Sequence, residues 1–128
     1  EISAERTYKM AGVKPEDVDV AEIHDCFSIA SLIAAEGLGF FGFGTAGEAW
    51  MKGEADIGGK IAVNPSGGLK SKGHPIGATG VGQVYEIAKQ LRGEVEPERQ
   101  VPNAKIGMTD TLGGDAGTVC NLILQRGW

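Results

Sequence analysis

The sequence lacks the features that mark several large classes of protein. Its 128 residues include only two cysteines, Cys26 and Cys120, which is too few for a disulfide framework. No apolar run reaches the roughly 18 residues that a transmembrane helix requires. The 12 basic residues form no stripe, and 17 acidic residues bring the net charge to −5. We therefore expect no membrane span and no nucleic-acid partner, and reduced thiols favour a cytoplasmic location.

The chain also lacks an initiator methionine, internal repeats and low-complexity segments. It opens with Glu1-Ile2-Ser3, which leads us to expect a piece of a longer protein. With 41% hydrophobic and 23% charged residues, the composition is that of a globular protein. The length predicts one domain over residues 1–128.

The order of apolar patterns predicts an α/β fold. Helices are expected at 3–11, 28–36 and 77–92, and strands at 17–23, 60–63, 105–111 and 118–125. Helices alternating with strands favour parallel pairing with right-handed crossovers, and a turn at 112–117 predicts a closing antiparallel hairpin. The sheet is thus expected to be mixed, mostly parallel and covered by helices. We also expect the apolar helix 28–36 to be buried and Cys120 to lie in the core.

Glycine is abundant, and it concentrates around one histidine. The segment Asn64-Pro65-Ser66-Gly67-Gly68-Leu69-Lys70-Ser71-Lys72-Gly73-His74-Pro75-Ile76-Gly77-Ala78-Thr79-Gly80 follows the second predicted strand. Glycine at this density lets the backbone approach a ligand closely. The segments His24-Asp25-Cys26 and 111–117 follow two other strands. Ligands bind beyond the carboxyl ends of such strands, so a thiol, two imidazoles and glycine-rich backbone there favour acyl-transfer chemistry.

Structural explanations for the same residues remain open. Cys26 is by base rate a small packed side chain, although its place before a helix favours the thiolate. His24 could cap the following helix, with Asp25 as the N-cap acceptor. The two cysteines and two histidines lack the spacing of zinc ligands. The match to G-x-G-x-x-G at 42–47 does not follow a predicted strand, so we interpret it as accidental.

The motifs also resemble those of a known family. Residues 64–80 resemble the G-H-P-x-G-A-[ST]-G signature of thiolases. Glu22-Ile23-His24-Asp25-Cys26-Phe27 looks like the His-Asp-Cys-Phe form of the sterol-carrier-protein-2 type thiolases and their archaeal and bacterial relatives. The resemblance runs from about Ile2 to Gly127 and implies a thiolase-like C-terminal domain.

This resemblance implies roles for individual residues. His74 matches the histidine that activates the nucleophilic cysteine, and His24 stands where an asparagine lines the second oxyanion hole with a water. Thr111 occupies the place of the usual acid/base cysteine, and Cys26 is the natural substitute. The residues implied to bring backbone close to the acyl-CoA substrate are Asn64, Gly67, Gly68, Gly73, Gly113 and Gly114.

The resemblance further implies what the chain needs from outside. A thiolase has two similar halves, and the nucleophilic cysteine lies in the first, which is absent here, as is the loop domain that grips coenzyme A. The chain alone is expected to be inactive and, with an exposed apolar face, to form homo-oligomers. No metal or redox cofactor is implied, since the coenzyme A thioester is the substrate. The alternatives are a thiolase-like aldolase acting on a side-chain acyl-CoA and a non-catalytic subunit that binds lipid or acyl-CoA.

Overall fold

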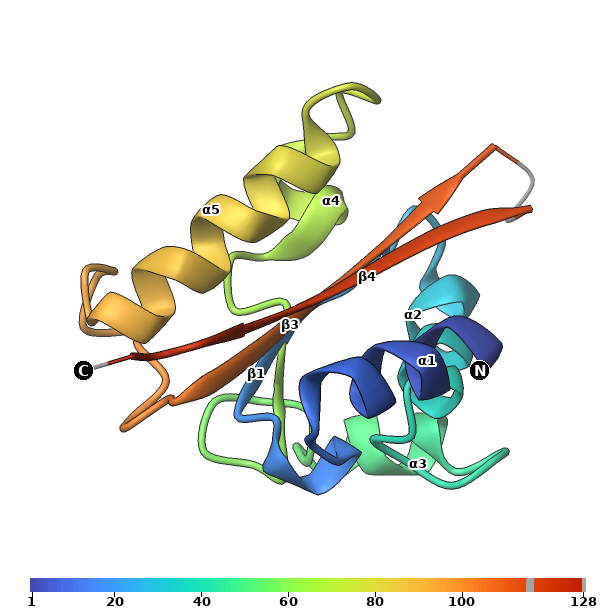
Figure 1. Ribbon diagram of the computed structural model, residues 1–128, viewed down its shortest axis with the longest axis horizontal. Helices are drawn as coiled ribbons and strands as arrows, with labels where there is room; N and C mark the ends of the chain where they lie inside the picture. Colours follow the sequence, from blue (N-terminus) through green and yellow to red (C-terminus); the bar gives the residue numbers. More distant parts are fainter. Residues whose placement is uncertain (115–116, 128) are drawn as a thin grey trace.

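A four-stranded sheet separates two layers of helices in the computed structural model, which describes residues 1–114 and 117–127 (Figure 1). The strands are β1 (Val20–Glu22), β2 (Ala62–Val63), β3 (Ile106–Gly113) and β4 (Thr118–Gln125), in the order β2-β1-β3-β4. β1 pairs in parallel with β2 and β3, and β3 pairs antiparallel with β4. The predicted mixed, mostly parallel sheet ending in an antiparallel strand is confirmed.

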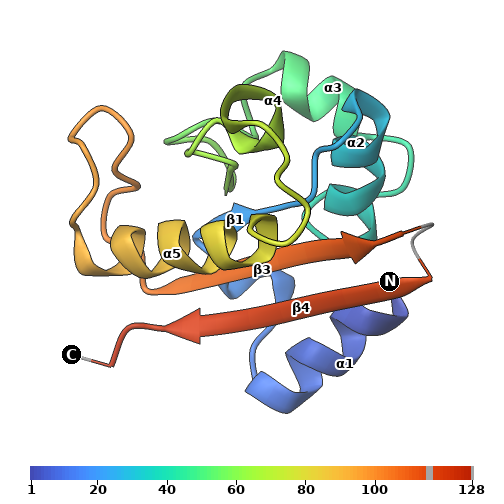
Figure 2. The ribbon, with the colours of Figure 1, turned by 90° about the horizontal axis from the view of Figure 1, so that it is seen from above.

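The helices are divided between the two faces of the sheet. They are α1 (Ile2–Ala11), α2 (Ser28–Gly37), α3 (Ala46–Met51), α4 (Gly68–Lys72) and α5 (Thr79–Arg92). Figure 1 shows α4 and α5 on one side and α1, α2 and α3 on the other. Figure 2 shows β3 and β4 as long neighbouring strands, with β4 at the edge.

Each face of the sheet has its own hydrophobic core, because strand side chains alternate between the two faces. Ala21, Ile23 and Met108 pack against the layer of α1, α2 and α3. Val20 packs against α5 on the other face, beside Ile87. This explains why the first predicted strand is apolar on both sides.

Two short helices were not predicted, and β1 is shorter than expected. α3 falls in the irregular 40–59 segment, and α4 lies inside the glycine-rich segment. α4 can begin there because Gly67, at φ 91°, turns the chain into its first residue. The predicted strand starts at Asp17, but Asp17 is the last residue of a 3₁₀ turn, Pro15–Asp17, in which its carboxylate accepts from the Lys14 N–H at 2.8 Å.

Two burial predictions are wrong. Ile29 and Ile33 of α2 are 59% and 62% exposed, because none of the described elements packs over that side of the helix. Cys120 is exposed, as are Thr118 and Val119 before it, at the start of the edge strand β4. In the predicted turn at 112–117, Asp115 and Ala116 lie outside the described residues, while Leu112 and Gly113 still belong to β3.

The close approach of α5 to the sheet requires glycine at position 107. A Cβ built on Gly107 would overlap the Ile87 side chain and lie 3.3 Å from that of Val20. We predict that Gly107→Ala lowers the free energy of unfolding by about 1–3 kcal/mol, the usual cost of overpacking a core. Chemical denaturation measures this change.

Gly82→Ala is the matched control for this substitution. Gly82 lies within α5, where an added Cβ meets nothing within 4 Å. Alanine is the better helix former by about 1 kcal/mol, so this variant should be at least as stable as the parent chain. Equal stability of the Gly107→Ala and Gly82→Ala variants would contradict the prediction.

Candidate active site

Two imidazoles from distant parts of the sequence meet beyond the carboxyl end of β1. His24 follows β1, and His74 follows α4. Their ring centroids are 4.9 Å apart and the rings are nearly perpendicular, at 85°. His24 is only 5% exposed, whereas His74 is exposed to solvent. The structure thus brings together the two histidines expected from the sequence to share one site.

The side chain of Asn64 joins the two segments that carry these histidines. Its Oδ1 accepts from the Ile23 N–H at 2.7 Å, and its Nδ2 donates to the Ile23 carbonyl at 3.3 Å. Its own backbone N–H donates to the carbonyl of Ala21 at 2.7 Å, continuing the parallel pairing of β1 and β2. Asn64 has φ 52°, a left-handed conformation that asparagine tolerates better than most residues. Its amide therefore fixes the backbone next to His24.

Asp25 holds α4 in place. Its Oδ1 accepts from the Leu69 N–H at 2.7 Å, one of the free donors in the first turn of α4. The prediction that His24 or Asp25 caps the following helix is wrong, because α2 begins at Ser28, its N-cap residue is Phe27, and no side chain caps it. The carboxylate lies so close to Gly68 that an added Cβ would overlap it. Gly68 is therefore needed for this contact.

The Thr79 hydroxyl sets the orientation of His74. His74 Nδ1 lies 2.7 Å from Thr79 Oγ1, which donates its own hydrogen to the Pro75 carbonyl at 3.3 Å. The hydroxyl hydrogen is thus used elsewhere, and the oxygen is left to accept from an Nδ1–H. This assignment leaves Nε2 of His74 with a free lone pair, in the form of a general base.

His24 sits in surroundings that favour its neutral form. Burial lowers the pKa of His24 most, and repulsion from His74 lowers it further. The carboxyl groups of Asp110 and Asp25 act in the opposite direction with smaller effect. A neutral imidazole can donate one N–H to a substrate oxygen.

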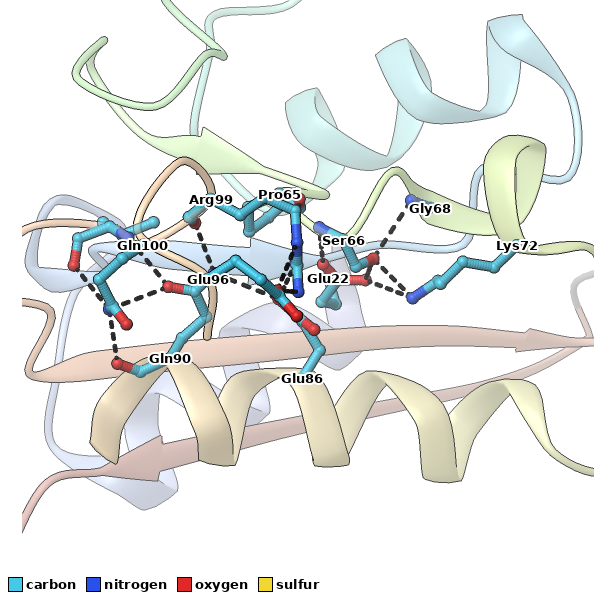
Figure 3. A network of polar contacts seen from close by, with 11 residues as sticks. Glu22, Pro65, Ser66, Gly68, Lys72, Glu86, Gln90, Glu96, Arg99 and Gln100 are labelled. Atoms are coloured by element: carbon cyan, nitrogen blue, oxygen red, sulfur yellow. Dashed lines mark hydrogen bonds and ion pairs between the residues drawn. The ribbon is translucent and has the colours of Figure 1, made fainter. Parts of the chain in front are cut away.

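A polar network beneath the loop links it to β1 (Figure 3). Glu22, only 1% exposed, accepts from the Ser66 N–H at 3.1 Å and from its hydroxyl at 2.6 Å. Lys72 donates to Ser66 Oγ at 2.5 Å and lies 3.5 Å from the Glu22 carboxylate. Burial raises the pKa of Glu22, against the opposing effects of Ser66 and Lys72. The network connects a residue two before His24 to a residue two before His74.

A second part of this network ties the loop to α5. Arg99 donates to the Pro65 carbonyl at 3.3 Å and to the Glu86 carboxylate at 2.7 Å, and it also pairs with Glu96 (Figure 3). The hydrogen bonds to Glu86 and Glu96 raise the pKa of Arg99. The start of the loop is thus held from both sides.

The remaining predicted site residues either provide a backbone conformation or, in the part of the chain that the structure describes, make no measured contact with the two imidazoles. Cys26 is exposed, and the described part of the chain shows no hydrogen bond to its thiol. Gly73, at φ 83°, has open space around it and lets the chain leave α4 toward His74. Gly113 ends β3, and Gly114 has φ 57°. No measured contact among the described residues joins these two glycines to the imidazoles.

The structure identifies polar residues that were not predicted. Thr79 belongs to the recognised motif, but its contact with His74 depends on the first turn of α5. Asp110 is only 4% exposed, and the backbone N–H of His24 is among the groups that lower the pKa of its carboxyl group, against the larger effect of burial. The sequence already indicated that Asp110 is unusual, because it shares one face of its strand with Ile106 and Met108, which are both apolar.

Within residues 1–114 and 117–127, no three His, Cys, Asp or Glu side chains are grouped so that they could hold a metal ion. None of the helices in this part of the chain is long and apolar enough to cross a membrane. A cavity of about 560 Å³ beside Asp25 and Asn64 is lined by Trp50 and Lys70 among others, but not by the imidazoles.

Comparison with known families gives one match over nearly the whole chain. The profile of the family described as "Thiolase C-terminal domain-like" matches residues 1–126. Among solved structures, the Ltp2-ChsH2(DUF35) aldolase superimposes with a TM-score of 0.82 at 25% sequence identity. The superposition covers 97% of this chain and 31% of the aldolase chain.

Several known proteins are similar to this chain in sequence. The acetyl-CoA acetyltransferases of Methanothermobacter thermautotrophicus and Methanocaldococcus jannaschii are each 50% identical, over 124 and 128 residues, covering 97% of this chain. Sterol carrier protein 2 of Oryctolagus cuniculus is 47% identical over 120 residues, 94% of this chain. The chain spans 32%, 33% and 22% of the length of these three relatives.

The contact between Thr79 and His74 can be tested by removing the hydroxyl. We predict that Thr79→Val releases the His74 ring from the single tautomer with Nδ1 protonated, because Nδ1 loses its acceptor. Nitrogen-15 NMR of the imidazole distinguishes the two tautomers. Thr79→Ser keeps the oxygen and should preserve the parent tautomer, and the same tautomer in Thr79→Val would show that Thr79 does not set it.

Proposed function

Because this chain belongs to the Thiolase C-terminal domain-like family, we propose that it is the C-terminal half of an acyl-CoA acyltransferase. The parent reaction is Claisen condensation of two acyl-CoA molecules, or the thiolytic reverse. The observation that carries the proposal is the perpendicular contact of His24 and His74 at 4.9 Å. The 50% identity to two acetyl-CoA acetyltransferases supports it.

In the first step, His74 acts as the general base. Its Nε2 accepts the proton of a cysteine thiol that belongs to the N-terminal half. The thiolate then attacks the acyl-CoA carbonyl, and coenzyme A leaves as a thiolate that takes the proton back from His74. The products are an acyl-cysteine and free coenzyme A. The exposure of His74 suits this step, since the base must face a residue from outside the chain.

In the second step, Cys26 and His24 act on the other acyl-CoA. The Cys26 thiolate removes a proton from the α-carbon, and the N–H of neutral His24, together with a water, stabilises the enolate oxygen. The enolate carbon attacks the acyl-cysteine carbonyl, a carbon–carbon bond forms, and the cysteine thiolate is released. The backbone at Asn64, Gly67, Gly68 and Gly73 and at Gly113 and Gly114 approaches the acyl-CoA.

The proposal also covers the assembly, the location and the cofactors of the complete protein. The N-terminal half, on the same or a partner chain, closes over the exposed imidazole, and the complete protein forms homo-oligomers in the cytoplasm. The reaction uses the coenzyme A thioester as substrate and needs no metal or redox cofactor.

An aldolase acting on a side-chain acyl-CoA is the second candidate. The observation that favours it is the TM-score of 0.82 to the Ltp2-ChsH2(DUF35) aldolase. The two candidates differ in the N-terminal half, because only the acyltransferase requires a cysteine at the nucleophile position. A non-catalytic subunit that binds lipid or acyl-CoA is the third, and absence of acyl-CoA turnover with the cognate N-terminal half would favour it.

The role of Cys26 gives a direct test of the mechanism. We predict that Cys26→Ala in the complete parent protein lowers the condensation rate by about 10²–10⁴-fold, the usual contribution of a general acid–base group. Cys120→Ala is the matched control, since this second exposed cysteine lies on the edge strand β4 and should not affect the rate. Condensation preserved within a few-fold in Cys26→Ala would remove Cys26 from the mechanism.

The surface of this chain that contacts the N-terminal half can be located through apolar side chains next to His74. Ile76, Val81 and Tyr85 are 87%, 71% and 63% exposed and follow His74 into α5. We predict that Val81→Lys weakens association with the N-terminal half by about tenfold or more, because the contact would desolvate a charge. Binding of separately expressed halves measures this effect.

Met10→Lys provides the control for the association experiment. Met10 is 88% exposed on α1, on the opposite side of the sheet from α5. This variant should associate like the parent chain. An equal loss in both variants would place the contact elsewhere.

A further inference from the structure

A buried polar pair lies across β3 and β4 behind His24. Asp110 and Asn121 are directly opposite each other in the strand register and are 4% and 9% exposed. Asn121 Nδ2 donates to Asp110 Oδ1 at 2.8 Å. The other oxygen of each side chain, Asp110 Oδ2 and Asn121 Oδ1, is buried without a hydrogen-bond partner. Two such atoms on one hydrogen-bonded pair call for an explanation, because buried polar atoms are nearly always paired.

The chemistry of the two groups supplies that explanation. A carboxyl and an amide are planar groups with two polar atoms each, and they can form two parallel hydrogen bonds when they face each other. One of these bonds is the N–H···O bond from Asn121 to Asp110. The two remaining atoms, Asp110 Oδ2 and Asn121 Oδ1, are both oxygens, and both can only accept if the carboxyl is ionised. Exchanging N and O of the Asn121 amide does not remove the problem, because the amide oxygen would then lie 2.8 Å from Asp110 Oδ1, which also only accepts.

We infer that Asp110 is a neutral carboxylic acid at neutral pH, and that its Oδ2–H donates to Asn121 Oδ1 in a cyclic acid–amide pair that positions His24. One proton satisfies both unpaired oxygens. The pair then has no charge, which suits a site from which water is excluded.

The surroundings of the carboxyl group agree with this state. Burial raises the pKa of Asp110 more than any other influence. The Asn121 amide, the backbone N–H and ring of His24, and the amino group of Glu1 each act in the opposite direction. These are the charged and polar groups that β4, the end of β1 and the start of α1 present to the carboxyl group.

The pair acts on the proposed reaction through His24. The backbone N–H of His24 faces the Asp110 carboxyl group and lowers its pKa, so the pair lies against the point from which the imidazole extends. An ionised carboxylate at the same place would favour the imidazolium form of His24, 4.9 Å from His74. A neutral acid holds the backbone without adding that charge. Asp110 is therefore a positioning residue, and this role in catalysis rests on the proposed function.

Infrared spectroscopy of the complete parent protein tests the protonation state independently of activity. The difference spectrum of wild type minus Asp110→Asn near neutral pH should contain the carbonyl band of a protonated carboxylic acid. Carboxylate bands in that difference spectrum would overturn the inference. Asparagine has nearly the same shape as the protonated acid and can form the same two hydrogen bonds with Asn121, so the variant should fold.

The pH dependence of the condensation rate tests the positioning role. Asp110→Ala should lower kcat, because it removes the pair beside His24, whereas Asp110→Asn, a neutral group that can form the same pair, should restore kcat to within about twofold and leave the acidic limb of the pH profile in place. Asn121→Asp adds a carboxyl that brings one negative charge to the pair and should move the acidic limb to higher pH. A limb that moves to lower pH in Asp110→Asn would show that the carboxyl is ionised. If the parent catalyses no condensation, the proposed function fails, and the infrared result still decides the state of Asp110.

Discussion

The hydrogen bonds between the Asn64 amide and the backbone of Ile23 are the contact on which the site depends. β2 is only two residues long, so strand pairing alone gives the following loop little support. The amide extends that pairing by one side chain, at 2.7 and 3.3 Å, past the point where the strands end. Asp25 then holds the first turn of α4 through Leu69. Because both contacts are made by residues flanking His24, the position of His24 and the path of the loop toward His74 are set together.

The sequence predicted the sheet well because its signals were long or repeated. Apolar alternation marked the strands, glycine and proline marked their ends, and the order of elements limited the pairing to parallel strands with a final hairpin. The meeting of His24 and His74 followed from the same rule, since the carboxyl ends of parallel strands share one edge. The short helices α3 and α4 carry no such signal. Their five or six residues are held by contacts with distant parts of the chain, as Asp25 holds α4.

The wrong predictions share a physical cause, which is that local patterns do not reveal the partner of a side chain. Asp25 precedes α2 and has the composition of a cap for it, yet its carboxylate reaches a helix more than forty residues away. Cys120 has apolar neighbours along its strand, but β4 has a strand on one side only. The apolar surface of α2 indicates burial that the described elements do not provide. Each case required the position of another element, which only the fold determines.

Burial gives the interior of the site a consistent electrostatic character. It raises the pKa of Glu22 and Asp110 and lowers that of His24, and each shift favours the uncharged form of the group. Hydrogen bonds and neighbouring charges oppose these shifts without being their largest cause. Burial of His24 has a consequence for the proposed chemistry. The N–H dipole of His24 acts in surroundings of low dielectric constant, where it interacts more strongly with a developing enolate oxygen. Beneath the loop, ion pairs of Lys72 with Glu22 and of Arg99 with Glu86 hold the segments that lead to the two imidazoles, and the opposite charges of each pair offset one another.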